Sequence, residues 1–106
     1  MLKIKATVTF LPANEGGRSN PPMSGYRPPL WFGQRRDGDD LLWDFELTFP
    51  GLASDMPVAF GQEIEAEMRS STASSEDLAV EPGTAFEVRE GARVVGRGRA
   101  VEVLAE

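Results

Sequence analysis

The sequence predicts an all-β domain, a small antiparallel barrel of about five or six strands. Apolar and polar residues alternate with a period of two along several segments, which is typical of strands with one buried and one solvated face. Between these segments lie runs rich in Gly, Pro, Asn and Ser, which favour turns. With 106 residues and 41% hydrophobic content, the chain can bury a single core, so one domain is expected over 1–106.

In the first half of the chain, alternation is clearest near the N-terminus. From Leu2 onward every second residue is apolar and the others are Lys or Thr, which predicts a strand over Ile4 to Phe10. The segment 41–49 alternates in the same way, with Trp and Phe among its apolar positions. Irregular or turn-forming connections are expected at 12–29, 35–40 and 50–57.

The second half carries three more alternating segments, at 63–68, 86–89 and 94–104. Near Ala100-Val101 the apolar parity slips by one residue, which predicts a β-bulge or bend. Gly96 and Gly98, in the same segment, suit close packing at a barrel corner.

Ser70 to Asp77 is the least regular stretch and is rich in Ser and Thr. Ser74 or Ser75 precedes Glu76-Asp77, so either hydroxyl could cap a short helical turn. The segment is otherwise expected to be a loop.

Composition excludes most enzyme chemistry. The chain has no Cys and no His, which removes disulfides, thiol nucleophiles, Cys-built zinc sites and the commonest general base. No G-x-x-x-x-G-K-[ST] motif is present, so no P-loop can hold a nucleotide. Asp37 to Asp40 resembles a calcium loop, but Thr48 stands where the bidentate Glu is required, so a solvated hairpin turn is expected. We therefore expect no enzyme activity, no cofactor and no metal.

The charge balance bears on possible partners. The formal net charge is -6, and nucleic-acid binding needs clustered Lys or Arg, so the balance argues mildly against RNA. It does not decide the question, because Arg89, Arg93, Arg97 and Arg99 lie within one short segment. No apolar run is long enough to span a bilayer, so a cytoplasmic protein without membrane contact is expected.

Two motifs far apart in the chain point to a known family. Residues 15–29 read EGGRSNPPMSGYRPP, residues 83–98 read GTAFEVREGARVVGRG, and Phe60-Gly61 lies between them. In this order they resemble the GGR loop, the GYRP segment, the MPG segment and the REGGRTVGAG hairpin of the C-terminal β-barrel domain, domain 3, of elongation factor Tu.

The resemblance implies a Greek-key-like antiparallel barrel of about six strands, in which Gly25 to Pro28 opens the second strand. In the family this barrel works beside a GTPase domain, whereas this chain is expected to be a stand-alone domain. The resemblance also implies that the loop of Arg18 and the turn at Gly91 would lie near the T stem of aminoacyl-tRNA.

Departures from the family pattern change the surface charge. Where the family has a basic residue before proline, a tRNA contact, this chain reads Ser74-Ser75-Glu76-Asp77, which adds repulsion toward phosphate. The family's TVGAG appears as VVGRG, so Arg97 is new, and Arg99 adds another cation. Alternation is expected to place Arg93, Arg97 and Arg99 on one face as a basic stripe.

These motifs define a candidate surface for tRNA or a protein partner: Arg18, Ser19, Asn20, Arg27, Arg89, Glu90, Gly91, Arg93, Arg97 and Arg99. Arg18 lies in a loop with no core to serve, which favours an interface role. For Arg27, a buried hydrogen-bonding fork and an interface role both stay open. Arg89 and Glu90 could form a local ion pair before the turn. The motif glycines are expected to serve the backbone, and Ala92, which replaces the second Gly of REGGR, requires a negative φ.

Two functions remain open. We expect a non-enzymatic protein-interaction module that contacts or mimics the translation machinery, for example a translation factor or another protein partner. The alternative is residual binding of the T stem of aminoacyl-tRNA through Arg18, Arg93, Arg97 and Arg99. Net charge and the acidic pair Glu76 and Asp77 disfavour that alternative.

Overall fold

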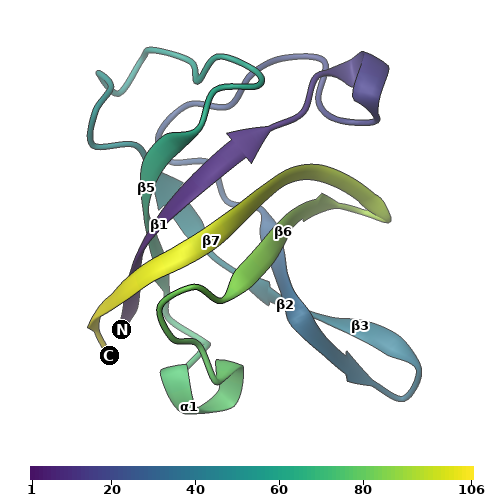
Figure 1. Cartoon of the computed structure of the whole chain (residues 1–106), viewed down its shortest axis with the longest axis vertical. Helices are drawn as coiled ribbons and strands as arrows, with labels where there is room; N and C mark the ends of the chain where they lie inside the picture. Colours follow the sequence, from purple (N-terminus) through teal and green to yellow (C-terminus); the bar gives the residue numbers. More distant parts are fainter.

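The computed structural model describes residues 1–106 and contains one antiparallel sheet of seven strands (Figure 1). The strands are β1 (Leu2–Phe10), β2 (Pro29–Arg36), β3 (Asp39–Asp44), β4 (Glu46–Thr48), β5 (Ile64–Ser70), β6 (Ala85–Glu90) and β7 (Arg93–Ala105). Their order across the sheet is β3-β2-β6-β7-β1-β5-β4. The connections include a 3-10 turn, η1 (Ala13–Glu15), and one short helix, α1 (Ser75–Leu78). The predicted all-β class is confirmed.

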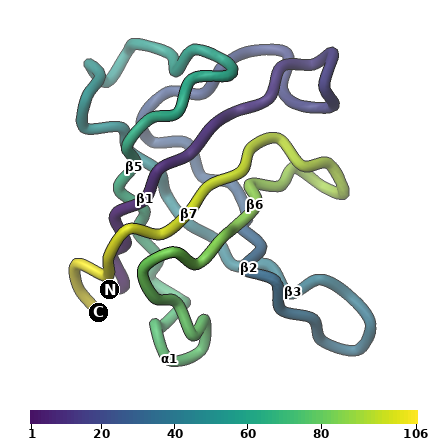
Figure 2. Tube along the Cα trace, in the orientation of Figure 1, coloured from purple at the N-terminus to yellow at the C-terminus, as the bar shows by residue number.

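The sheet curls into a barrel-like shape because its two edge strands follow each other in the chain. β3 pairs with β2 and β4 pairs with β5, and only the buried Phe45 separates β3 from β4. One strand was predicted over 41–49; an interruption at Phe45 divides it between the two edges and brings the number of strands to seven. Figure 2 shows the backbone wrapping around the core. The strand order leaves β3 and β4 as unpaired edges, so the sheet does not close into a ring.

The segment Gly25 to Pro28 leads into the second strand without belonging to it. β2 begins at Pro29, and before it the amide of Leu47 donates to the Tyr26 carbonyl at 2.7 Å. Proline has no N–H to donate to a ladder, so two consecutive prolines delay regular pairing. The segment still covers the free edge of β4 through the isolated bridge between Tyr26 and Leu47.

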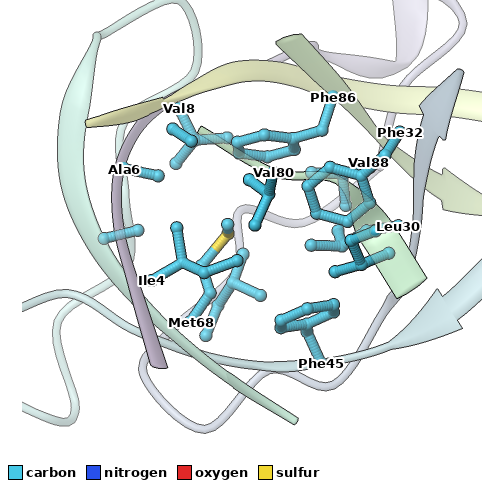
Figure 3. Packing of buried hydrophobic residues seen from close by; sticks show 14 of the residues in the cluster. Ile4, Ala6, Val8, Leu30, Phe32, Phe45, Met68, Val80, Phe86 and Val88 are labelled. Atoms are coloured by element: carbon cyan, nitrogen blue, oxygen red, sulfur yellow. The ribbon is translucent and has the colours of Figure 1, made fainter. Parts of the chain in front are cut away.

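The core is built from the inward faces of the strands. Alternate residues of β1, from Leu2 to Phe10, are at most 1% exposed, which confirms the predicted period of two. Figure 3 shows Ile4 and Val8 of β1 facing side chains from the opposite strands. The other labelled core residues are Ala6, Leu30, Phe32, Phe45, Met68, Val80, Phe86 and Val88.

Strand β7 carries the predicted irregularity. Lys5 pairs with Glu102 and Ala6 with Ala100, so Val101 is an extra residue and the β-bulge is confirmed. Close packing of Gly98 is also confirmed, because a Cβ there would lie 2.3 Å from the Thr7 carbonyl oxygen.

Helix α1 confirms the predicted cap. Ser74 adopts an extended backbone and its Oγ accepts a hydrogen bond from the Asp77 amide at 3.1 Å. Leu78 anchors the helix in the core, where it is 3% exposed. No helix of the structure combines the length and the apolar character needed to cross a membrane.

Removal of this cap should lower stability measurably. Ser74→Ala leaves the Asp77 amide without its acceptor, so we expect the free energy of unfolding to fall by about 1 kcal/mol. Urea denaturation measures the change, with Ser71→Ala as the control because Ser71 is exposed. Equal stability of the two variants would show that the cap contributes nothing.

Candidate binding surface

The loop after β1 and the β6–β7 turn lie close together at one end of the barrel (Figure 1). Arg18 of the loop pairs with the Glu90 carboxylate, and the Tyr26 hydroxyl donates to the same carboxylate. Arg93 donates from Nη1 to the Gly17 carbonyl at 3.1 Å, and its Nη2 lies 3.6 Å from Glu90 Oε1. We name these side chains the Glu90 cluster: Arg18, Tyr26, Glu90 and Arg93.

Arg18 was expected to have no core to serve, but the structure gives it several partners within the protein. Its guanidinium carbon lies 4.7 Å from the centroid of the Tyr26 ring, and its Nε donates to the Asn20 carbonyl at 2.9 Å. The Tyr26 ring meets Phe10 edge-on, with centroids 6.0 Å apart, so the cluster is attached to the core. The Arg18 side chain is 26% exposed, so most of it is covered by the fold.

Burial and pairing shift the pKa values of Glu90 and Tyr26. Burial alone would raise the pKa of Glu90, but hydrogen bonds from Tyr26 and Arg18 and the charges of Arg18 and Arg93 bring that pKa below its ordinary value. Burial, followed by the hydrogen bond to Glu90, raises the pKa of the Tyr26 hydroxyl. At neutral pH the cluster therefore holds a carboxylate between two guanidinium groups and a protonated phenol.

The glycines of the cluster's loops serve the backbone, as expected, but for different reasons. Gly16 and Gly91 have φ of 87° and 61°, a region that favours glycine. Gly17 is required for space, because a Cβ would lie 1.8 Å from the Leu11 carbonyl oxygen. Ala92 is not among the residues with positive φ, so alanine fits the position at which the family has the second glycine of REGGR.

Ser19, Asn20 and Arg27 lie on the surface, as a binding role requires. Arg27 does not form a buried fork: its side chain is 77% exposed and its Nη2 lies 3.0 Å from Glu46 Oε2. Glu46 also binds Arg69 Nη2 at 2.6 Å. An interface role for these three residues stays a prediction.

Arg89 lies beneath the surface and does not pair with Glu90. Its side chain is 11% exposed, and its Nη2 lies 3.0 Å from Asp40 Oδ2 and 2.7 Å from Glu87 Oε1. Successive residues of a strand point to opposite faces, so Arg89 and Glu90 meet different neighbours. The expected ion pair between Arg89 and Glu90 is therefore wrong, whereas a binding role for Arg89, of which only a small part is exposed, stays a prediction.

The predicted stripe of Arg93, Arg97 and Arg99 is also wrong. Val88 pairs with Gly96 but Arg89 pairs with Val94, so Val95 is an extra residue and forms a further β-bulge, in the ladder with β6. The bulge reverses the parity of the strand. The Arg93 guanidinium consequently reaches the Glu90 cluster, whereas Arg97 and Arg99 remain on the outer face.

Arg97 and Arg99 border a groove of about 400 Å³ on the outer face of the sheet, which we name the outer groove. Its other lining side chains include Thr7 and Thr9 of β1, Trp31 of β2 and Glu87 of β6. Arg97 makes no ion pair or side-chain hydrogen bond, and Arg99 donates only to the Gly83 carbonyl, at 3.1 Å.

Of the 11 Lys and Arg side chains, only Arg36, Arg97 and Arg99 lack a carboxylate partner. Two of these three border the outer groove. The sequence predicted its two arginines but not Trp31, Thr7 or Thr9. Only the alternation of β1 could have indicated Thr7 and Thr9, because it places both side chains on the outward face of the strand.

The acidic turn forms the predicted hairpin. Asp37 and Gly38 have φ of 54° and 86°, as a two-residue hairpin turn of type I′ requires. The Asp40 carboxylate lies 3.2 Å from Arg35 Nε and 3.0 Å from Arg89 Nη2, so both of its oxygens are engaged by arginine side chains. The structure contains no group of three or more His, Cys, Asp or Glu side chains arranged to hold a metal ion.

Comparison with known proteins agrees with the motifs. A family model described as "Elongation factor Tu C-terminal domain" matches residues 1–104. Elongation factor Tu 2 of Streptomyces avermitilis is 33% identical over 103 residues, which cover 95% of this chain. The match covers 23% of that relative, so this chain spans about a quarter of its length.

Proposed function

The chain belongs to the family of elongation factor Tu C-terminal domains, and from this premise we propose that it is a non-enzymatic protein-binding module that contacts or mimics the translation machinery. The family assignment supports a translation-factor-like module in general terms. It also implies a cytoplasmic location, where translation factors work. The partner itself has to follow from the surface of this chain.

The observation that carries this proposal is that three arginines of the motif regions form ion pairs with carboxylates of the same chain. Arg18 and Arg93 both bind Glu90, and Arg89 is held by Asp40 and Glu87. A contact to phosphate requires cations that are free to neutralise it, and a cation that leaves its own carboxylate gives up a charge-assisted hydrogen bond. The motif end of the barrel therefore offers a largely neutralised surface, which suits a protein better than a polyanion.

Two further features support a protein partner. The exposed Glu76 and Asp77 lie in α1, where the family pattern has a basic residue. The net charge of -6 also repels phosphate over most of the surface. A catalytic role has no support, because no paired acid, base and nucleophile lie together, and the matched family describes a non-catalytic domain.

The test is affinity capture from a nuclease-treated lysate of the source organism. We expect the tagged protein to retain translation components, such as a GTPase domain or an exchange factor, that an unrelated acidic domain of similar charge does not retain. Nuclease treatment removes proteins that are tethered only through RNA. A set of captured proteins without any translation component would overturn the proposal.

Residual binding of aminoacyl-tRNA remains the second candidate. It is favoured by Arg97 and Arg99, whose guanidinium groups have no carboxylate partners and lie on the same outer face. A contribution from Arg18 and Arg93 would require both to leave Glu90. Salt dependence separates this candidate from the first, because each phosphate contact releases counterions.

A further inference from the structure

We propose that the outer groove binds an acidic peptide segment, in which one Asp or Glu stands beside an apolar residue. The proposal rests on the proposed function and names the chemistry of the partner. Its first support is the pair of arginines at the rim. The Arg97 side chain makes no hydrogen bond or ion pair, and the Arg99 side chain donates only to the Gly83 carbonyl, so both guanidinium groups can donate to a carboxylate.

The neighbouring strand adds neutral donors beside each cation. Thr9 pairs with Arg97 and Thr7 pairs with Arg99 in the ladder between β1 and β7. Both threonines line the groove, so their hydroxyls are available on the same face as the two guanidinium groups. A carboxylate can accept from a guanidinium and a hydroxyl together, which gives the site a preference for an anion with oxygen acceptors.

The opposite wall is apolar and held in position. Trp31 lines the groove, and its indole Nε1 donates to the Gln34 carbonyl at 2.7 Å. The Arg89 guanidinium carbon lies 4.9 Å from the centroid of the Trp31 ring. Gly33 and Ala85 leave space beside this ring for an apolar side chain of a ligand.

The sheet also offers a backbone partner at this place. β2 pairs with β6 only through Leu30 with Val88 and Trp31 with Glu87. Ala85, two residues before Glu87 on β6, therefore has no strand partner on the β2 side. An extended segment lying there could bond to this free backbone, as peptides do when they add to a sheet edge.

The same groove disfavours a nucleic acid. Glu63 and Glu87 line it together with the two arginines, and Glu63 has no ion-pair partner. A phosphate backbone carries a charge on every unit and would meet these carboxylates. A peptide with a single acidic residue can place its carboxylate at Arg97 and Arg99 and its apolar neighbour at Trp31.

Selection from a displayed library of random peptides tests this inference on the full chain. We expect the protein to enrich peptides in which Asp or Glu stands beside an apolar residue. The double variant Arg97→Glu/Arg99→Glu should recover such peptides about tenfold less, since each lost charge-assisted bond weakens binding. Arg36→Glu is the matched control, because Arg36 also lacks a carboxylate partner but lies outside the groove, and it should behave as the original protein.

Both arginines of the groove are exposed, so the variants are expected to fold, and thermal unfolding verifies this. If the double variant is unstable, Arg97→Gln/Arg99→Gln must show the same loss of recovery. Absence of an enriched acidic motif, or enrichment that persists in the double variant, overturns the inference. Binding of polyuridylate that the double variant loses would assign the groove to nucleic acid and also overturn it.

The lysate experiment separates this inference from the proposed function. If the double variant still captures the translation components that the original chain captures, the groove is not the docking site and the proposed function stands. If the original chain captures none of them, the proposed function fails, whatever peptides the groove selects.

Discussion

Gly17→Ala should lower the free energy of unfolding by about 3 kcal/mol, since the added methyl overlaps backbone atoms that cannot move without opening the loop. Its Cβ would lie 1.8 Å from the Leu11 carbonyl oxygen and 2.4 Å from the Leu11 carbonyl carbon. The same region is closed by hydrogen bonds from the Gly17 amide to the Pro12 carbonyl and from the Arg18 amide to the Leu11 carbonyl. Displacement of the loop would therefore also move Arg18 away from Glu90.

Urea denaturation of the variant gives the magnitude, and Gly51→Ala provides the matched control. A Cβ at Gly51 meets nothing within 4 Å and its φ is not in the left-handed region, so we expect a change below about 0.5 kcal/mol. A loss at Gly17 no larger than that at Gly51 would show that the loop does not pack as described.

Glu90→Gln should cost about 2 kcal/mol, because it removes the charge that two guanidinium groups and a phenol share. The amide keeps the size of the side chain, so the change reports on charge rather than on packing. Arg18 and Arg93 would be left facing each other across a neutral group. Glu81→Gln is the control, since Glu81 is exposed and its side chain has no ion pair. Equal losses in the two variants would contradict a stabilising role for the Glu90 cluster.

The pH dependence of this difference has a defined sign. The pKa of Glu90 is lowered in the folded protein, so its contribution is complete above the unfolded pKa of about 4.3. As the pH falls through the lower folded pKa, Glu90 becomes protonated and the contribution is lost. The stabilities of Glu90→Gln and the original protein should therefore converge in acid, which urea denaturation at several pH values measures.

Most of the fold was predictable because alternation records burial directly. The segments of β1, β5, β6 and β7 were all recognised, and the bulge at Val101 was visible as a slip in apolar parity. The interruption at Phe45 was not visible, because Phe45 continues the alternation of 41–49 and is buried like Leu47 and Phe49. Only the pairing partners, β2 on one side and β5 on the other, distinguish β3 from β4.

Less of the candidate site could be predicted, because its geometry depends on one residue that alternation does not mark. The bulge at Val95 leaves no visible slip in the alternation of apolar and polar residues. It nevertheless turns Arg93 away from Arg97 and Arg99 and toward the Glu90 cluster. Tyr26 and Glu90 are 64 positions apart, and no local rule predicts that they meet. The outer groove likewise depends on the separation of β2 from β6 beyond Trp31.

The charge of Arg97 is the clearest link between sequence and proposed function. It was identified as a departure from the family pattern, and it is one of the cations without a carboxylate partner. Arg18, Arg89 and Arg93 by contrast are paired with carboxylates of the same chain. This division leads to a domain whose family motifs stabilise the barrel and whose free cations lie on a separate face.

Titration of the protein with aminoacyl-tRNA at low and at moderate salt tests most directly whether this chain is a protein-binding module or binds tRNA. We expect no saturable binding at low salt, because the motif cations are paired and the net charge is -6. Saturable binding that weakens steeply with salt and disappears in Arg97→Glu would contradict the proposal of a protein-binding module and establish the tRNA alternative.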